Sequence, residues 1–215
     1  MLFRSNATVV SLKHQGKENV KHKPPIENKD LQCLKSSQVL ALSSPLSLLR
    51  NVLFHIVLFF CRRGREGQRT LKTTSFHPGG IADVPSTEKL AQMYETEEAN
   101  DGCKALKLYM SKLNLKSESF FQYPRKNWSF DDNIWYEARP VGVNSLDSMV
   151  KNISKAASLS KLYTNHSVRV TAITLWSNAG ITNRHIMAIS GHKNEQSLAH
   201  YNTHTSTSQD RKSVV

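Results

Sequence analysis

The stretch that decides the fold and the chemistry is HSVRVTAITLWSNAGITNRHIMAISGHKNEQSLAHY, residues 166–201. His166 and Arg169 lie three residues apart, so a helix would place both side chains on one face. His192 follows a glycine at a predicted helix end, where a tight turn can direct its side chain outward. Tyr201 lies nine residues further on, and one short helix would return its phenol to the same cleft. The spacing therefore allows these four side chains to converge.

These residue types suit a reaction at a phosphodiester. Arginine holds two phosphate oxygens in a planar fork and does not lose its proton. Histidine transfers protons near neutral pH, whereas tyrosine, with a pKa of about 10, needs a base or a positive field before it attacks phosphorus. Such a set would cut DNA by transesterification and needs no metal ion or other cofactor. Taken singly, His192 is also explained as a structural histidine and Tyr201 as a core tyrosine.

The rest of the chain predicts a mainly α domain with a small antiparallel β-sheet. Ser44 and Pro45 form a helix start, and a nearly all-apolar helix follows from Leu46 to Gly64 or beyond. A helix that is apolar on all sides belongs at the centre of a domain. Residues 70–76 alternate and predict a strand, whereas residues 117–136 are rich in turn residues and predict irregular structure.

Glycine and threonine set the expected helix ends in the last third of the chain. Gly180 ends a helix that starts at His166, because glycine is favoured just past a helix C-terminus. Thr182 begins a second, short helix, and Gly191 ends it. A final turn or two of helix leads to Tyr201.

The charge of the chain favours a polyanionic partner. Its 215 residues carry a formal net charge of +12, with 39% hydrophobic and 21% charged residues, which fits one folded domain rather than a disordered chain. Nucleic acid is the commonest partner of such a basic domain, so we expect double-stranded DNA. A protein that is merely basic is the alternative.

Two groups of basic residues are candidates for contacts with DNA. Arg62, Arg65 and Arg69 cluster at a predicted helix end, where they would contact the DNA backbone or simply be favoured by the helix dipole. Arg125 and Lys126 lie close to a tryptophan in the irregular segment predicted over 117–136. Such a basic and aromatic patch suits DNA backbone and bases, although the tryptophan is also explained by packing on the core.

Several other classes of site are not expected. The three cysteines are scattered and form no paired motif, so we expect a reducing intracellular compartment without disulfides or a zinc ribbon. The apolar run from Val52 to Cys61 is too short to cross a bilayer, so we expect a buried helix and no membrane partner. His200 and His204 have a spacing seen in zinc sites, but no cysteine pair precedes them, so no metal site is expected.

Three motifs resemble the second half of the tyrosine recombinase (phage integrase) signature: His166-Ser-Val-Arg169, Gly191-His192 and Tyr201, with matching spacing. Arg63-Gly-Arg-Glu66 resembles its first arginine box. The resemblance implies a DNA breaking–rejoining catalytic domain. Arg63 and Arg169 would clamp the phosphate. His166 and His192 would assist proton transfer and phosphate contact, and Tyr201 would attack phosphorus to leave a 3′-phosphotyrosyl bond and a free 5′ hydroxyl.

Four further segments resemble one group within this family, the Crypton DNA transposons of eukaryotes. The segments are Lys23-Pro-Pro-Ile26, Phe60-Cys-Arg-Arg-Gly-Arg-Glu66, Phe120-Phe-Gln-Tyr-Pro124 and Ser190-Gly-His-Lys-Asn-Glu195. Domesticated relatives of this group form the C-terminal domains of zinc-finger MYM-type and glutamine-rich nuclear proteins. The resemblance therefore implies transposon origin and a location in the nucleus.

The expected domain organisation is a disordered basic arm over 1–23, the recombinase-like domain over 24–204 and a polar tail over 205–215. The arm and the tail are inferred from their polar composition, and the domain from the resemblance. The N-terminal helical domain with which such recombinases close around DNA is expected to be absent. The family places a β-hairpin with a catalytic lysine before the loop that His77-Pro-Gly-Gly80 resembles, but here Phe76 leads directly into that loop. We expect the lysine hairpin to be missing, and neither Lys72 nor Lys89 is assigned as the general acid.

Three functions stay open at this point. The first is DNA strand breakage and rejoining, for site-specific recombination or integration, by a homo-oligomer on DNA and without a small-molecule cofactor. The second is a catalytically inactive, domesticated module that binds DNA or chromatin, since the lysine hairpin is missing. The third is a truncated transposon product that does not fold stably, because a missing hairpin would leave a sheet edge uncovered.

Overall fold

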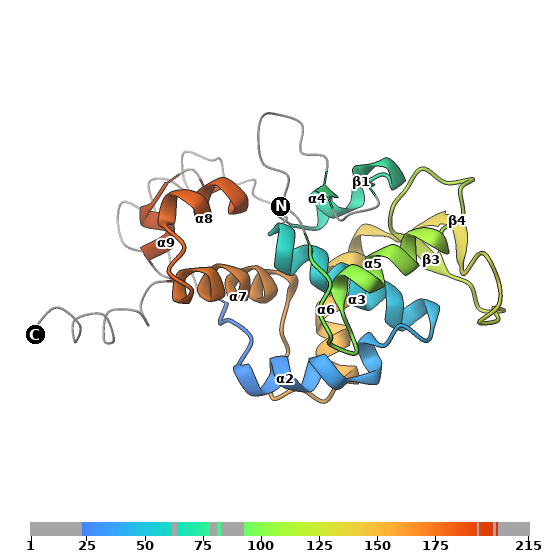
Figure 1. Ribbon diagram of the computed structural model, residues 1–215, viewed down its shortest axis with the longest axis horizontal. Coiled ribbons are helices and arrows are strands. Elements are labelled where there is room, and N and C mark those ends of the chain that lie inside the picture. Colours follow the sequence, from blue (N-terminus) through green and yellow to red (C-terminus); the bar gives the residue numbers. More distant parts are fainter. Residues whose placement is uncertain are drawn as a thin grey trace, which may run out of the picture.

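The computed structural model describes residues 23–61, 64–77, 81–82, 93–192, 194–199 and 201. Within these residues helices predominate, and two short antiparallel strand pairs accompany them, as predicted for a mainly α domain (Figure 1). The elements in chain order are α2 (Asn28–Ser36), η1 (Gln38–Leu40), α3 (Pro45–Phe60), α4 (Gly64–Arg69), η2 (Thr73–Ser75), β1 (Phe76–His77), β2 (Ile81–Ala82), α5 (Gly102–Ser111), β3 (Gln122–Pro124), β4 (Tyr136–Pro140), α6 (Val143–Ala156), α7 (Asn165–Asn178), α8 (Asn183–Ser190) and α9 (Gln196–Ala199).

Helix α3 begins as predicted. The Ser44 hydroxyl accepts a hydrogen bond from the N–H of Ser47 at 3.2 Å, and Pro45 occupies the first helical position. This side-chain bond satisfies one of the N–H groups that have no partner inside the helix, and proline loses nothing there because its missing N–H would be unpaired anyway.

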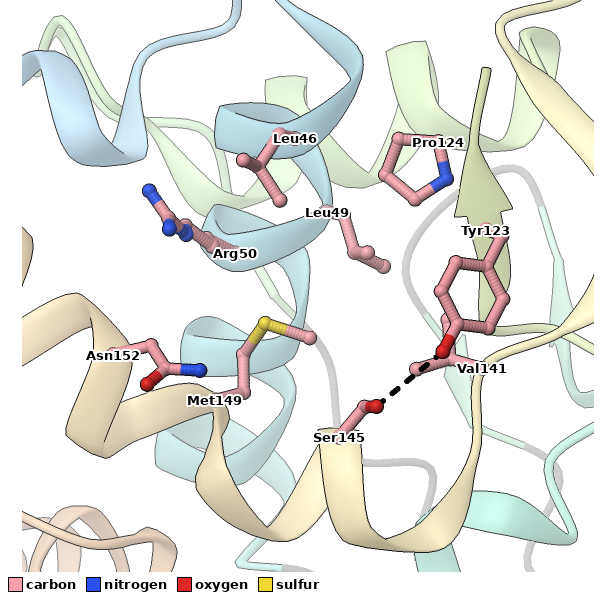
Figure 2. Close-up of a pocket in the computed structure, with 9 residues that line it drawn as sticks. All are labelled: Leu46, Leu49, Arg50, Tyr123, Pro124, Val141, Ser145, Met149 and Asn152. Carbon is pink, nitrogen blue, oxygen red and sulfur yellow. Dashed lines mark hydrogen bonds between the residues drawn. The ribbon is translucent and has the colours of Figure 1, made fainter. Parts of the chain in front are cut away.

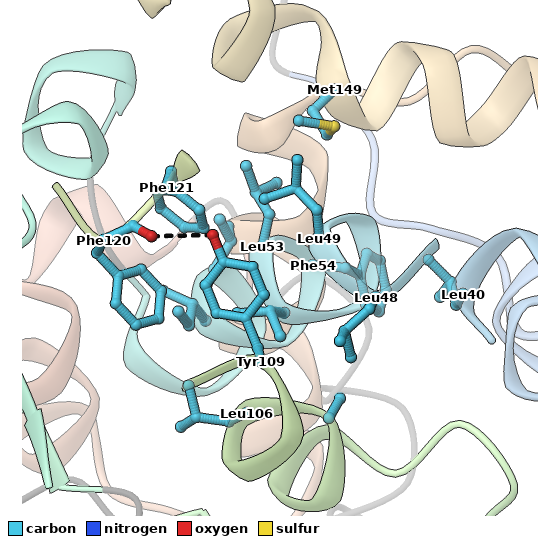
Figure 3. Packing of buried hydrophobic residues seen from close by; sticks show 14 of the residues in the cluster. Leu40, Leu48, Leu49, Leu53, Phe54, Leu106, Tyr109, Phe120, Phe121 and Met149 are labelled. Atoms are coloured by element: carbon cyan, nitrogen blue, oxygen red, sulfur yellow. Dashed lines mark hydrogen bonds between the residues drawn. The ribbon is translucent and has the colours of Figure 1, made fainter. Parts of the chain in front are cut away.

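The core of the domain packs around α3. Apolar side chains of α3 are buried on almost every side of the helix, which contacts α5, α6 and α7. Figure 3 shows Leu49 and Leu53 of α3 among Tyr109 of α5, Phe120 and Met149 of α6. The Tyr109 hydroxyl donates a hydrogen bond of 2.9 Å to the Phe120 carbonyl oxygen, so the one polar atom of this buried ring is satisfied. The central position predicted for this helix is confirmed.

The predicted end of this helix is wrong. A single helix through Gly64 was expected, but α3 ends at Phe60 and α4 begins only at Gly64. Cys61 follows α3 with a φ of 49°, in the left-handed region that residues other than glycine rarely adopt. Cys61 is also buried, so this turn lies inside the domain. The hydrophobic pattern continues through Cys61 and therefore gave no indication of the break.

The strands also differ in part from the prediction. Residues 73–75 form the 3-10 turn η2, and the strand predicted over 70–76 is reduced to Phe76 and His77, which pair with Ala82 and Ile81. Part of the segment predicted to be irregular forms β3, which pairs with β4 in an antiparallel manner. The β1–β2 pair has no lysine among its four strand residues.

Helix α7 joins two hydrophobic clusters. The larger cluster surrounds α3 and includes Val168 at the start of α7. The smaller cluster consists of Cys61, Ala172, Ile173, Ile186 and Leu198, and so combines the end of α3 with α7, α8 and α9. In Figure 1, α8 and α9 lie at one end of the molecule against α7, while β3 and β4 lie at the other end.

Two sequence expectations concern residues that are mostly outside the described part of the chain. The arm predicted over 1–23 is described only at Lys23, and the tail predicted over 205–215 is not described at all. Among the helices that the structure does describe, none has the length and apolar character needed to cross a membrane.

Candidate functional site

The start of α7 is fixed by its own side chains. The N–H of Ser167 donates to Oγ1 of Thr164 at 3.4 Å, and the N–H of Thr164 donates to Oγ of Ser167 at 3.3 Å, which is a reciprocal capping box. His166 is exposed in the first turn, whereas Arg169 follows one turn later and is only 6% exposed. The capped helix therefore holds Arg169 inside the domain and His166 at its surface.

Arg169 connects the ends of two other helices. Its Nη1 donates to the carbonyl oxygen of Cys61, which follows α3, and its Nη2 donates to the carbonyl oxygen of Ser190, the last residue of α8. Carbonyl groups at helix C-termini lack partners inside the helix and carry the negative end of the helix dipole. A guanidinium that donates to two of them neutralises both ends and fixes α3, α7 and α8 relative to one another.

The turn after α8 positions His192. Gly191 has a φ of 68°, and its N–H donates to the carbonyl oxygen of Met187 at 2.8 Å, as expected for a glycine that ends a helix. Nδ1 of His192 then lies 2.6 Å from the hydroxyl oxygen of Ser190. His192 is half-buried. The predicted position of this histidine, just past a helix-ending glycine, is confirmed.

Tyr201 lies beside His192. The two ring centroids are 6.1 Å apart, and the ring planes are inclined by 54°. The N–H of Tyr201 donates to the carbonyl oxygen of Leu198 at 2.9 Å, which continues the turn of α9. The tyrosine ring is half-buried and packs on the smaller cluster, beside α7 and α8. As predicted, one short helix, α9, precedes Tyr201, and the Tyr201 ring lies beside His192.

Three of the five predicted catalytic residues therefore lie in one region. Arg169, His192 and Tyr201 surround the seam where α3 ends and where α7, α8 and α9 pack together. His166 shares α7 with Arg169 but is exposed. Arg63 lies outside the described residues, two positions after Cys61, whose carbonyl Arg169 contacts.

The residues predicted to contact DNA fall in two places. Arg62 lies outside the described residues, and Arg65 belongs to α4, but its side chain is not described. Arg69 is half-buried at the end of α4. All three positions follow the end of α3 along the chain.

Arg125 and Lys126 follow β3, at the opposite end of the molecule from α8 and α9 (Figure 1). Both side chains are exposed. Nη1 of Arg125 donates to the carbonyl oxygen of Ile134 at 2.9 Å and lies 3.8 Å from a carboxylate oxygen of Asp132. Arg125 therefore stabilises its own loop, and the patch is separate from the tyrosine site.

The structure places neither Lys72 nor Lys89, the two lysines near His77-Pro-Gly-Gly80 in the sequence, as a general acid. Nζ of Lys72 lies 3.0 Å from a carboxylate oxygen of Glu118, and both side chains are exposed. The backbone of Lys72 forms an isolated antiparallel bridge with Ser119. Lys89 lies outside the described residues.

The described residues contain no group of three or more His, Cys, Asp or Glu side chains that could hold a metal ion. His200 and His204 lie outside those residues.

A cavity of about 160 Å³ lies away from the tyrosine site, between α3, β3 and α6, and sequence reasoning missed it (Figure 2). Leu46, Leu49 and Met149 line it with mainly apolar atoms, and none of the predicted site residues reaches it.

This fold is that of the catalytic domain of tyrosine recombinases. XerA recombinase is similar with a TM-score of 0.61 and 17% identity, over 91% of this chain and 67% of that chain. The Tn1549 transposon integrase, solved in complex with transposon right-end DNA, has a TM-score of 0.62 and 16% identity, over 97% of this chain and 70% of that chain. A lambda integrase dimer bound to a core site has a TM-score of 0.55 and 13% identity, over 91% and 69%.

Residues 86–208 match the phage integrase family, which is more than half of the chain. The chain therefore belongs to the phage integrase family. No curated protein sequence matches it significantly. The matched range contains four of the predicted catalytic residues, His166, Arg169, His192 and Tyr201, and excludes Arg63.

Proposed function

We propose that this protein breaks and rejoins DNA strands through a covalent intermediate at Tyr201. The observation that carries the proposal is the convergence of Arg169, His192 and Tyr201 at one seam, in a chain of the phage integrase family. The net charge of +12 supports double-stranded DNA as the substrate. Several solved structures with this fold contain DNA, which supports the same partner and an assembly of more than one copy.

The proposed reaction exchanges one ester bond for another. The phenol oxygen of Tyr201 forms a bond to phosphorus, and the bond from phosphorus to the 5′ oxygen breaks. The phenol proton passes to a base at the site, and the leaving 5′ oxygen takes up a proton to become a hydroxyl. Rejoining is the reverse attack by a 5′ hydroxyl on the 3′-phosphotyrosyl bond, so neither a metal ion nor a cofactor enters the balance.

The side chains have distinct proposed roles. Arg63 and Arg169 stabilise the negative charge that grows on the phosphate oxygens, since preorganised donors at such a site lower the barrier. His166 and His192 contact the phosphate and transfer protons. Arg62, Arg65, Arg69, Arg125 and Lys126 contact the DNA backbone. The general acid is not assigned, since neither Lys72 nor Lys89 lies in the sequence context where the family places its lysine.

A covalent trapping experiment tests this proposal. A pooled DNA duplex library with a sulfur atom at the 5′-bridging position is mixed with the protein, and adducts are resolved on denaturing gels. Sulfur leaves without a proton, so a missing lysine does not prevent the reaction. We expect an adduct that is lost in Tyr201→Phe while DNA binding persists. Binding by both proteins without any adduct would contradict the proposal.

A non-catalytic module that binds DNA or chromatin is the second candidate. The missing lysine hairpin favours it, since Phe76 leads directly into His77-Pro-Gly-Gly80. If this candidate is correct, Tyr201→Phe leaves the biological effect of the protein unchanged. In both cases the affinity for DNA should fall steeply with salt, because each phosphate contact releases counterions.

Crypton-type ancestry, transposon origin and a nuclear location belong to the same proposal. They rest on the sequence resemblance of the segments around Pro24, Arg63, Phe120 and His192. A truncated transposon product that does not fold stably is the remaining alternative. A sharp thermal transition of the purified chain would exclude it, since a single packed core unfolds cooperatively.

A further inference from the structure

Ser190 contacts two of the proposed site residues at once. Its backbone carbonyl oxygen accepts a hydrogen bond from Nη2 of Arg169, and its hydroxyl oxygen lies 2.6 Å from Nδ1 of His192. Ser190 is 3% exposed, so water competes poorly for the hydroxyl. Ser190 begins the segment Ser190-Gly-His-Lys-Asn-Glu195, but neither that resemblance nor the proposed reaction gives it a role.

The geometry around Gly191 makes this double contact possible. Ser190 is the last residue of α8, and Gly191 adopts a φ of 68°. A left-handed residue turns the chain out of the helix direction, so His192 comes back beside Ser190 and does not continue the axis. The imidazole is therefore held through one ring nitrogen by a buried hydroxyl on the same short segment.

We propose that Ser190 is the positioning residue of His192. Its hydroxyl holds Nδ1 and thereby presents Nε2 to a phosphate bound between Arg169 and Tyr201. The arrangement follows a general pattern in which a third group orients a catalytic base. The proposal rests on the proposed strand breakage at Tyr201, since the phosphate that Nε2 would contact is the one that Tyr201 attacks.

A hydroxyl suits this task because it both donates and accepts. When His192 carries its proton on Nε2, the Ser190 O–H donates to Nδ1. When Nδ1 carries a proton, in the other tautomer or in the imidazolium, the N–H donates to Oγ of Ser190. The contact persists whether the ring gains or loses a proton, so the ring keeps its orientation through the reaction. A carboxylate would only accept and would fix the proton on Nδ1.

The two contacts of Ser190 can be separated experimentally. The bond to Arg169 uses the backbone carbonyl, which any substitution retains, whereas the bond to His192 uses the side chain. Ser190→Ala therefore removes the His192 contact and leaves the Arg169 contact in place. Ser190→Thr restores the hydroxyl, and Ser190→Cys keeps the volume with a much weaker hydrogen-bonding group.

The first test reads the His192 ring without requiring DNA cleavage. The full chain is labelled with ¹⁵N-histidine, and His192→Gln identifies the His192 signals among the nine histidines. We expect the same Nδ1 chemical shift in the wild type and in Ser190→Thr. In Ser190→Ala and Ser190→Cys the Nδ1 signal should shift, because this nitrogen loses or weakens its hydrogen bond to residue 190. Unchanged signals in Ser190→Ala would overturn the proposal.

The second test measures adduct formation with the sulfur-containing DNA. Ser190→Ala should react about tenfold more slowly, which corresponds to the loss of one hydrogen bond in the transition state. Ser190→Thr should recover most of the rate. The double variant Ser190→Ala/His192→Gln should be no slower than His192→Gln alone. A further tenfold loss in the double variant would overturn the proposal, because Ser190 would then act by another route.

Controls separate the possible failures. Ser148→Ala removes a hydroxyl from α6 that bonds only to its own helix, so it should change neither readout. Thermal melts of each variant exclude unfolding as the cause of a lost rate. If the wild type forms no adduct, the proposed function fails, and the nitrogen signals alone then decide whether Ser190 orients His192.

Discussion

Arg169 has an observed structural role and a proposed catalytic one, which a simple loss-of-activity experiment would confuse. Its guanidinium is proposed to hold phosphate, and it also donates to the carbonyls of Cys61 and Ser190. Arginine has five N–H donors in a planar arrangement, so structural and phosphate contacts are compatible in one side chain. The residue is therefore a structural connection between three helices as well as a candidate for catalysis.

We predict that Arg169→Ala destabilises the fold by roughly 2–4 kcal/mol, because two buried carbonyl groups lose their donors. Urea unfolding followed by circular dichroism measures this change. Arg184→Ala, at an exposed position of α8, is the matched control and should change stability by less than about 0.5 kcal/mol. Equal stability of Arg169→Ala and the wild type would mean that the two carbonyl contacts contribute little.

We predict that Gly191→Ala costs about 1–2 kcal/mol, since a side chain disfavours the left-handed conformation that Gly191 adopts at a φ of 68°. No atom lies within 4 Å of the added Cβ, so the cost belongs to the backbone alone. Gly191→Asn should lose less, because asparagine tolerates this conformation. Gly67→Ala has equal space without a left-handed backbone and should be neutral or slightly stabilising in the same melts.

At the scale of the elements, sequence patterns located the helix ends that depend on special residues. Gly180, Thr182 and Gly191 bound α7 and α8 as predicted, because capping and left-handed backbone are local preferences. The Thr164 cap that begins α7 was not predicted. The end of α3 was missed, since Cys61 carries no such preference and its left-handed turn depends on packing. The two-residue strands β1 and β2 were beyond any periodic pattern, which needs several residues to be visible.

The candidate site was also predictable only in part. His166, Arg169, His192 and Tyr201 were indicated by residue type, spacing and resemblance. Ser190 was missed because serine at a helix end is common and its contact with His192 needs the turn at Gly191. The two carbonyl partners of Arg169 were missed because any residue provides a carbonyl.

The contact between α3 and α5 provides a prediction about pH. Nδ1 of His55 lies 2.7 Å from Oδ1 of Asn51, and the ring packs so closely on α5 that a Cβ at Gly102 would lie 2.6 Å from it. Burial lowers the pKa of His55 below its usual 6.5, although Asp101 and Glu98 act in the opposite direction. The folded protein thus keeps the ring neutral at a pH where the unfolded chain binds a proton.

We predict that this contribution to stability is complete above pH 6.5 and is lost as the pH falls, because the unfolded state then binds more protons. The loss approaches about 1.4 kcal/mol per pH unit while the folded state stays neutral. Thermal melts at pH 7.5, 6.5 and 5.5 measure it. His55→Gln removes the titrating group and should flatten this part of the pH dependence. An identical slope in both proteins would contradict the prediction.

At the scale of the whole molecule, the proposed site lies between two unequal hydrophobic clusters. The larger one surrounds α3, while the smaller one has five buried residues from the end of α3, α7, α8 and α9. Elements with few buried apolar contacts open at lower free energy than the main core does. Tyr201 packs against the smaller cluster and His192 lies beside Tyr201, so we expect the proposed nucleophile to lie on the part of the fold that opens at lower free energy.

We predict that native-state hydrogen exchange is faster in α8 than in α3. Leu198→Ala should increase exchange in α8 and change global stability little, because it removes packing from the smaller cluster alone. Leu53→Ala is the matched control in the larger cluster, where it should cost about 2–5 kcal/mol and increase exchange throughout. Both leucines are at most 1% exposed, so the two variants differ mainly in which cluster they weaken. If both accelerated exchange everywhere to the same degree, the two clusters would unfold as one unit. Separate responses would mean that α8 and the segment leading to Tyr201 can rearrange on DNA while the core around α3 stays folded.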